Sequence, residues 1–306
     1  MTYDLICLGN LTIDDIVLPD HTVRKDCFGG DAIYAALGAS FWSDSVALVA
    51  PIGNDFPSQY LDLLPEHGLE TRGMPKRSIP GIRNWVRYQD GNIRSWELQS
   101  NPDDFLELSP RMEDIPPNYL DALGFLLLAM DLKAQETLAP QLRIYGLVAV
   151  DLQEDYIAGN EQRILEMVKY TDVFLPSHEE VFRLMGHRDY QLACRQFAEH
   201  GARIVCIKLG SSGSLVYERT RDQFWKIPVY PTKVVDTTGA GDAYCGGFLA
   251  MYLQTGDLLK AGIAGAVSAS FAVEDFGLSH MFSVTRQQAL ARMIELEATF
   301  DFQWRR

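Results

Sequence analysis

Short, continuous runs of apolar residues recur along the chain, and segments with helical spacing separate them. Runs of this kind are "DLICLGN", "SVALVAPIG", "DALGFLLLAM", "LVAVDLQ", "DVFLPS" and "RIVCIKLG". Strands without polar alternation are typical of a parallel sheet that is buried on both faces. Right-handed crossovers through the intervening helices make such a sheet doubly wound. The pattern predicts one α/β domain over residues 1–306, with a doubly wound, mostly parallel sheet and helices on both faces.

Two segments break this alternation. Residues 82–98, "IRNWVRYQDGNIRSWEL", have two β-like arms around Asp90-Gly91-Asn92, which is a hairpin signal. Residues 16–28 are irregular and polar. We expect the two segments to pair into a small β-lid that projects from the main sheet; two unrelated surface loops are the alternative. Near the other end, residues 242–298 are expected to be almost wholly helical.

Composition and charge exclude several classes of protein. The 306 residues carry a net charge of −14, which argues against a nucleic-acid partner because such proteins usually present a basic face. The longest apolar run, residues 125–130, is too short to span a membrane. The N-terminal "MTYDLICLGN" is expected to be a strand and not a signal peptide. Five scattered cysteines without a C-x-x-C pair predict reduced thiols in a cytoplasmic protein and no structural zinc.

The stretch "DTTGAGDAYCGGF", residues 236–248, is the strongest chemical signal. It leads from a strand-like run into a helix, whose first N–H groups lack partners and favour an anion. Through its interaction with the helix dipole, Asp242 in the same turn would stabilise the helix by only ~0.3–1 kcal/mol. Gly246 and Gly247 lie inside the helix and cost roughly 1 kcal/mol each against alanine. Another element must therefore pack very close to this helix.

The same stretch matches neither of two common phosphate-binding motifs. A Walker A loop needs Lys-Ser or Lys-Thr after its last glycine, and Gly241 is followed by Asp242. A dinucleotide fingerprint needs a glycine where Tyr244 stands, and it normally lies in the first βα unit. The second mismatch argues against a dinucleotide-dependent oxidoreductase.

Three weaker patterns accompany this stretch. Asp14 follows the first strand, and Gly29-Gly30 opens a helix. A carboxylate can accept hydrogen bonds from ligand hydroxyls and glycine lets the backbone approach closely, so the pattern suits a polyhydroxylated ligand. An aspartate in a loop is nevertheless usually solvated, and a glycine pair is usually a turn. Residues 207–213, "IKLGSSG", form either a tight turn or a site. Ser177 and Glu180 have the spacing of a helix capping box, which by itself would account for both.

Taken together, these stretches resemble the PfkB (ribokinase-like) family of sugar and nucleoside kinases. "DTTGAGDAYCGGFL" is similar to the C-terminal signature of that family, and "FGGDAIYAA" to its N-terminal Gly-Gly signature. "GNLTID", "SHEE" and "KLGSSG" resemble further motifs, in the right order. The resemblance implies a ribokinase-like fold, ATP and Mg²⁺ as cofactors, and transfer of the γ-phosphoryl group to a hydroxyl of a sugar-like small molecule.

The resemblance also implies roles for particular residues. Asp242 would be the catalytic base. Gly239, Ala240 and Gly241 would form the anion hole. The substrate contacts would be Asp14, Gly29, Gly30 and Tyr34; the nucleotide contacts would be Ser177, Lys208, Gly210, Gly213 and Gly277; and Glu180 would govern Mg²⁺ through water.

The sequence departs from the family pattern at several positions, and other functions are also open. Tyr34 stands where the family usually has Asn, which counts against a ribose- or adenosine-like substrate, and Ser177 and Lys208 replace Asn and Thr. A nucleoside kinase of the same fold is one alternative, favoured if Tyr34 or Trp85 offers a stacking surface near Asp14. A non-catalytic ligand-binding protein on a kinase scaffold is another. Lids in this family often pair across a dimer, so a homodimer through the lid is also an expectation.

Overall fold

The main sheet of the computed structural model, which describes residues 2–18, 20–89, 93–101 and 103–304, is long and mostly parallel. Within these residues it has nine strands in the order β13-β12-β11-β10-β9-β8-β1-β4-β5. In this order, the strands from β11 through β1 to β5 pair in parallel. Strands β12 and β13 extend the sheet antiparallel. The order reverses at β1, which confirms the doubly wound fold. The strands are β1 (Leu5–Leu8), β4 (Val46–Val49), β5 (Glu70–Gly73), β8 (Gly124–Leu127), β9 (Leu147–Val150), β10 (Val173–Phe174), β11 (Ile204–Lys208), β12 (Ser214–Glu218) and β13 (Gln223–Ile227).

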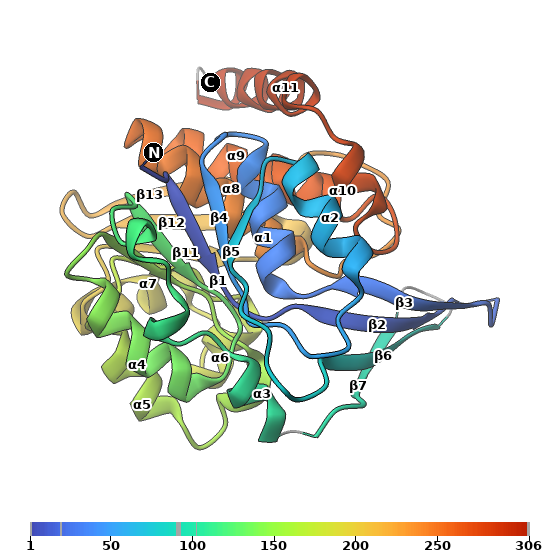
Figure 1. Cartoon of the computed structure of the whole chain (residues 1–306). Coiled ribbons are helices and arrows are strands. Elements are labelled where there is room, and N and C mark those ends of the chain that lie inside the picture. Colours follow the sequence, from blue (N-terminus) through green and yellow to red (C-terminus); the bar gives the residue numbers. More distant parts are fainter. Residues whose placement is uncertain (1, 19, 90–92, 102, 305–306) are drawn as a thin grey trace.

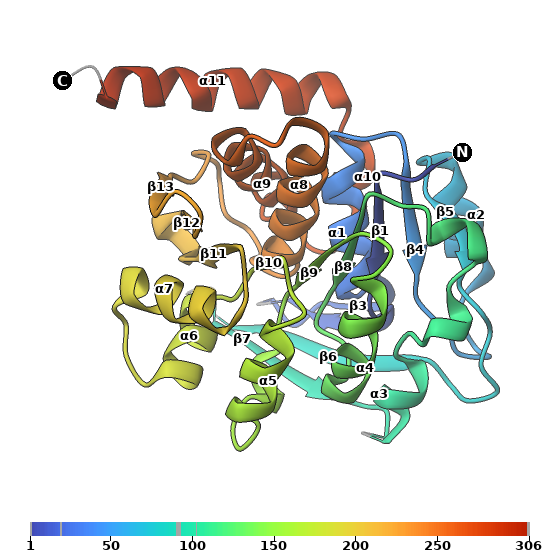
Figure 2. The ribbon, with the colours of Figure 1, turned by 90° about the vertical axis from the view of Figure 1, so that its left-hand side faces the viewer.

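Helices cover both faces of this sheet, as Figure 1 and Figure 2 show. One layer packs around α8 and α9, and the other around α4 and α5. The short α3 (Asp103–Leu108) lies beside β6. The first layer contains α1 (Asp31–Ser40), α2 (Ser58–Glu66), α8 (Ala240–Thr255), α9 (Leu258–Ala272), α10 (Ser279–Ser283) and α11 (Arg286–Trp304); the second contains α4 (Leu132–Leu142), α5 (Glu161–Val168), α6 (His178–Met185) and α7 (Tyr190–His200).

The surroundings of strand β1 explain why its sequence lacks polar alternation. Leu5 and Cys7 face the cluster around α1, α8 and α9, whereas Ile6 and Leu8 face the cluster around α4 and α5. All four side chains are fully buried. A central strand between two helical layers buries both of its faces, so it is apolar throughout.

Helix α8 is held between α1 and α9 at unusually short range. A Cβ atom added to Gly246 would lie 1.9 Å from the carbonyl oxygen of Ala35 in α1. One added to Gly247 would lie 2.2 Å from Oγ of Ser268 in α9. The glycine pair inside this helix is therefore explained by close packing on two sides, as the sequence predicts.

A second, four-stranded sheet projects from the main body at the right of Figure 1. Its order is β3-β2-β6-β7, and the parallel pairing of β2 with β6 joins two antiparallel hairpins. We call this sheet the lid. Its strands are β2 (Thr12–Val17), β3 (Val23–Gly29), β6 (Ile82–Gln89) and β7 (Ile93–Leu98).

The two lid segments pair as expected, but one of the boundaries was wrong. The N-terminal segment was expected at residues 16–28, whereas its first strand begins at Thr12 and includes Asp14 and Asp15. Pairing with β6 extends these polar residues into a strand, and a hydrophobic pattern does not report such long-range pairing. The turn expected at Asp90-Gly91-Asn92 lies outside the described residues.

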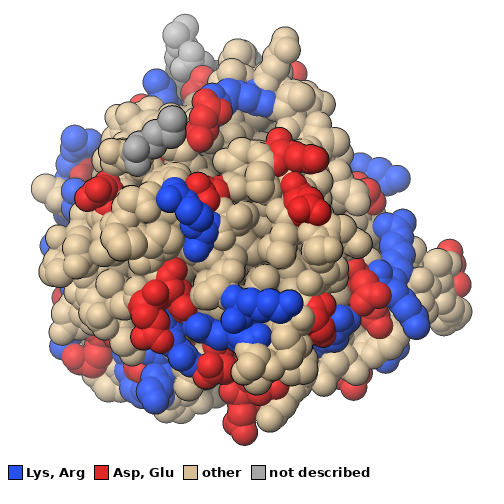
Figure 3. Space-filling view, in the orientation of Figure 1, with Lys and Arg blue, Asp and Glu red and all other residues tan. Residues whose placement is uncertain are grey.

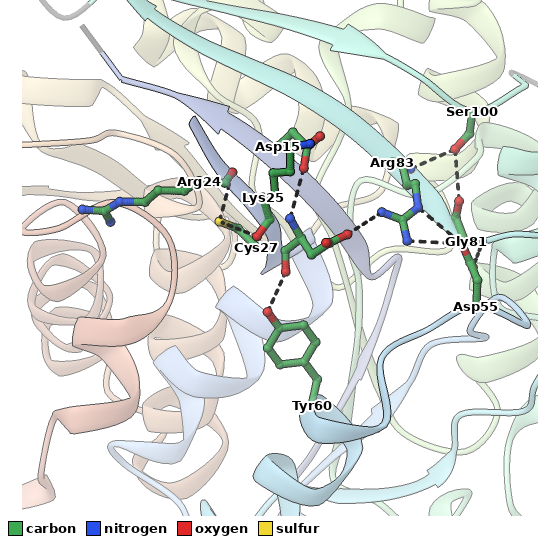
Figure 4. A network of polar contacts seen from close by, with 10 residues as sticks. Asp15, Arg24, Lys25, Cys27, Asp55, Tyr60, Gly81, Arg83 and Ser100 are labelled. Atoms are coloured by element: carbon green, nitrogen blue, oxygen red, sulfur yellow. Dashed lines mark hydrogen bonds and ion pairs between the residues drawn. The ribbon is translucent and has the colours of Figure 1, made fainter. Parts of the chain in front are cut away.

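Figure 4 shows a polar network that ties the base of the lid to the main body. The Arg83 guanidinium on β6 donates to Asp26 at 2.8 Å and to Asp55 at 3.3 Å. The Tyr60 hydroxyl of α2 donates to the carbonyl oxygen of Asp26 at 2.6 Å. Each partly exposed ion pair stabilises little alone, but together they fix where the lid leaves the sheet.

The surface carries both signs of charge. On the face drawn in Figure 3, Lys and Arg are interspersed with Asp and Glu. The five cysteines are free thiols, of which Cys27 is half-buried and the others are buried. Among the described helices, none is long and apolar enough to cross a membrane.

The close packing of α8 can be tested with Gly246→Ala. Because the new methyl group would collide with backbone atoms of α1 that cannot rotate away, we expect a loss of at least ~2 kcal/mol in the free energy of unfolding. Urea denaturation measures this loss. Gly256→Ala is the control: its φ of 66° is strained for alanine, but nothing lies within 4 Å, so we expect a loss of only about 1 kcal/mol. Equal stability of Gly246→Ala and wild type would contradict the packing explanation.

Candidate active site

The predicted anion-binding turn lies at the N-terminus of α8. Gly239 is the N-cap residue and has a φ of 72°, in the left-handed region that favours glycine. The Asp236 carboxylate accepts hydrogen bonds from the Thr238 backbone N–H at 2.9 Å and hydroxyl at 2.7 Å. This local turn presents the first N–H groups of the helix at its end. Asp242 follows in the first helical turn.

Tyr34 packs directly on this turn. A Cβ atom at Gly239 would lie 2.2 Å from the Tyr34 ring. Glycine is therefore required at this position both by the ring and by the positive φ of the backbone. Tyr34 is 3% exposed. Burial, and then the charges of Asp236 and Asp14, raise the pKa of Tyr34 well above its usual value. The aromatic residue in place of the family's Asn therefore connects the two predicted halves of the site.

The predicted substrate residues lie where the lid meets α1. The Asp14 carboxylate accepts from the Thr12 hydroxyl at 3.0 Å and from the Asn84 side-chain amide at 2.7 Å. A Cβ atom at Gly29 would lie 2.5 Å from an Asp14 carboxylate oxygen, and Gly30 caps α1 with a φ of 111°. The structure thus brings Asp14, Gly29 and Gly30 together, as the sequence predicts.

Asp31, the first residue of α1, is a site residue that the sequence analysis missed. Its carboxylate accepts from the backbone N–H of Asn10 at 2.9 Å. Burial raises the pKa of Asp31 well above its usual value, and the nearby charge of Asp242 raises it further. Carboxylates from two helix N-termini therefore lie close together. The only available signal was the position of Asp31 directly after the glycine pair.

A buried ion pair between Lys208 and Asp151 lies next to the predicted anion-binding turn. Lys208 Nζ lies 2.5 Å from an Asp151 carboxylate oxygen, and 3.4 Å from where a Cβ atom of Gly241 would be. Burial alone would lower the pKa of Lys208, but the charge of Asp151 outweighs it and holds that pKa well above its usual value. Asp151 was also missed, although it follows strand β9 directly.

Ser177 and Glu180 form the capping box that their spacing predicts. The Ser177 N–H donates to the Glu180 carboxylate at 2.6 Å, and the Glu180 N–H donates to the Ser177 hydroxyl at 3.3 Å. Glu180 is 7% exposed. Burial, and then the charge of Asp151, raise the pKa of Glu180 to about 8. The cap therefore holds a carboxyl group next to the Lys208–Asp151 pair.

The other predicted nucleotide residues are turn glycines. Gly210 and Gly213 bracket the turn between β11 and β12, with φ values of 58° and 87°. Gly277 lies in the loop between α9 and α10, with a φ of 70°. In the same loop, the Phe276 ring packs on Tyr88 of the lid, with centroids 4.9 Å apart. The Gly277 loop therefore adjoins the lid.

Tyr88 connects the lid to the anion-binding turn. Its hydroxyl lies 2.9 Å from the Thr238 hydroxyl oxygen. Because Thr238 donates its own proton to Asp236, Tyr88 is the donor in this pair. Trp85, suggested as a stacking surface, lies on the opposite face of the lid from Asn84, since neighbouring strand residues alternate, and Arg87 covers its ring at 4.8 Å.

The α/β fold brings the N-termini of α1 and α8 together at one edge of the sheet, and comparison with known proteins identifies the family as one of phosphotransferases. Residues 4–285 match the model of the pfkB family carbohydrate kinases. The chain belongs to this family and is a kinase that acts on a hydroxyl group.

Particular relatives have different substrates in their names. The chain is 31% identical to a cytidine kinase of Thermococcus kodakarensis, over 81% of this chain and 88% of the relative. It is 33% identical to a 5-dehydro-2-deoxygluconokinase of Geobacillus kaustophilus, over 90% and 89%. Among solved structures, a putative ribokinase II of E. coli shares the fold at a TM-score of 0.81 and 17% identity, covering 96% of this chain and 100% of that one.

The link between lid and turn can be tested with Tyr88→Phe. The substitution keeps the ring on Phe276 but removes the proton donated to Thr238, so the turn loses one of its supports. Since a hydrogen bond is worth about 1 kcal/mol, we expect kcat to fall about 5-fold while the Kd for ATP is unchanged. Steady-state kinetics and calorimetry measure the two quantities. An unchanged kcat would show that the contact does not position the turn.

Proposed function

We propose that this kinase uses ATP to phosphorylate a hydroxyl of a sugar or sugar derivative, with Asp242 as the base. The observation that supports this most is the position of Asp242 in the first turn of α8, directly after the left-handed Gly239. Backbone N–H groups and a carboxylate then share one helix end. Phosphoryl transfer depends mainly on positioning and charge stabilisation, and both are available there.

In this mechanism, the sugar hydroxyl lies between Asp14 and Asp242. Asp242 accepts the hydroxyl proton while the oxygen attacks the γ-phosphorus, and ADP leaves. The N–H groups of residues 239–241 would face the phosphoryl oxygens and stabilise their charge; that of Ala240 also donates within the turn to the Thr237 carbonyl oxygen at 3.4 Å. Asp14, Gly29, Gly30 and Tyr34 would bind the sugar.

The nucleotide would lie over the turn between β11 and β12. Gly210 leaves room for close approach to the backbone, since only a His178 ring carbon lies within 4 Å of its Cβ position. Gly213 shapes the same turn by packing on the Ile227 carbonyl oxygen, and Gly277 borders the lid side. Ser177 and Lys208 lie on neighbouring strand ends, joined by a parallel bridge. The Lys208 ammonium, beside Gly241, is suited to a phosphate oxygen.

Magnesium fits this site only in company with ATP. Among the described residues, no cluster of three His, Cys, Asp or Glu is placed to hold a metal alone. Oxygen ligands suit Mg²⁺, which usually keeps water and phosphate oxygens in its shell, so Glu180 would hold it through water. When bound, Mg²⁺ neutralises phosphate charge. An ATP- and Mg²⁺-bound structure of the E. coli ribokinase II, at a TM-score of 0.78, is consistent with this proposal.

A nucleoside is the second candidate substrate. The cytidine kinase match supports it, as does the 27% identity to a nucleoside kinase of Methanocaldococcus jannaschii over 89% of this chain and 91% of the relative. Of the two aromatic residues suggested as stacking surfaces, only Tyr34 adjoins the site. The expected homodimer through the lid stays a prediction.

The role of the base is tested by Asp242→Asn. Because asparagine cannot accept the hydroxyl proton, we expect the phosphorylation rate to fall by a factor of about 10³–10⁴, with the Kd for ATP within a few-fold of wild type. Asp257→Asn is a matched control, since Asp257 caps α9 and asparagine is an equally good cap. Turnover of Asp242→Asn within a few-fold of wild type would exclude Asp242 as the base.

The substrate class is tested by measuring ADP release with Mg-ATP across sugars, sugar acids, polyols and nucleosides. We expect a sugar or a sugar derivative to give the highest kcat/KM. A strong preference for nucleosides over every free sugar would favour the second candidate. Release of ADP that no compound stimulates would contradict both.

A further inference from the structure

Asn84 of the lid lies beside the predicted sugar-binding carboxylate. It pairs directly with Asp14 across the parallel strands β6 and β2, so the two side chains share one face of the lid. Asn84 is 3% exposed. Two positions further along β6, Val86 faces the same way, and then Tyr88, which reaches Thr238 before the anion-binding turn. Asn84 therefore lies on the face of the lid that leads from Asp14 to that turn.

The orientation of the Asn84 amide follows from its partner. Its NH₂ group donates to an Asp14 carboxylate oxygen at 2.7 Å. The reverse orientation would place a carbonyl oxygen against a carboxylate, since neither group can donate. The Asn84 carbonyl oxygen therefore points away from that carboxylate oxygen.

This carbonyl oxygen is buried without a hydrogen-bond partner among the described residues. Buried polar atoms in native proteins nearly always have a partner, so each exception needs an explanation. A group held by a neighbouring carboxylate cannot rotate to find another donor without breaking that hydrogen bond. A ligand that donates a hydrogen bond would satisfy it.

We propose that Asn84 determines substrate specificity by accepting a hydrogen bond from a second hydroxyl of the sugar, next to the hydroxyl bound by Asp14. This inference rests on the proposed function. A carboxylate and an amide carbonyl, side by side, both require donors, so they select a pair of adjacent hydroxyls. A sugar that lacks one of the two leaves the Asn84 carbonyl unpaired in the complex, and a site of this kind discriminates strongly against it.

The test compares wild type with Asn84→Leu on matched substrates. Wild type is assayed with Mg-ATP and D-ribose, D-fructose or cytidine, each beside its monodeoxy analogues. We expect one monodeoxy analogue of the best substrate to lose about 50-fold in kcat/KM. In Asn84→Leu this ratio should fall to within about 3-fold, because the rate with the complete sugar drops. The melting temperature of Asn84→Leu is compared with that of Thr12→Val, since each variant removes one hydrogen-bond donor to Asp14.

Thr12→Val is the matched control. It removes the other donor to Asp14 and leaves the Asn84 carbonyl in place, so both rates should fall while their ratio stays near 50-fold. A ratio that stays near 50-fold in Asn84→Leu, with the rates reduced equally for all sugars, would reduce Asn84 to a structural role. Wild type that phosphorylates no compound in the screen of sugars, sugar acids, polyols and nucleosides would overturn the proposed function itself.

Discussion

Contact between the backbones of α1 and α8 is the constraint on which the rest of the site depends. Gly246 meets Ala35 of α1 along this line, and the Cβ position of Gly38 lies 2.4 Å from the Ala243 carbonyl oxygen. Side chains larger than hydrogen would separate the two helices. Because both helices begin at the same edge of the sheet, their close approach brings the residues of both N-terminal turns together. Asp31 and Asp242 interact for this reason.

This geometry also resolves an electrostatic difficulty. The protein has a net charge of −14, and Asp31, Asp151, Glu180 and Asp242 lie around the place where an anionic nucleotide would bind. Compensation would come from preorganised backbone N–H groups at the helix end, which carry partial positive charge without a titratable group. Lys208 adds a full charge that its pairing with Asp151 holds in place. An acidic protein can therefore offer a local anion site.

The lid is joined to this centre by polar contacts more than by apolar ones. Asn84 reaches Asp14, and Tyr88 reaches Thr238. At its base, Arg83 connects it to Asp26 and Asp55. Its apolar cluster is small, with Ile16, Val86 and Tyr88 as its buried members. Since hydrogen bonds exchange with water at little net cost, such a lid is suited to opening and closing as ligands pass.

The sequence by itself determined the sheet, its two helical layers and the glycine turn that begins α8. These follow from local patterns: apolar strands without alternation, a glycine with positive φ before a helix, and a capping box at Ser177. It also predicted a close neighbour for α8, because glycine in a helix is costly without one. Only the tertiary structure decided which element that neighbour is, that β2 begins at Thr12, and that Asp31, Asn84 and Asp151 lie beside the predicted site residues. Their positions depend on contacts between segments far apart in the chain, which leave no periodic pattern around each residue.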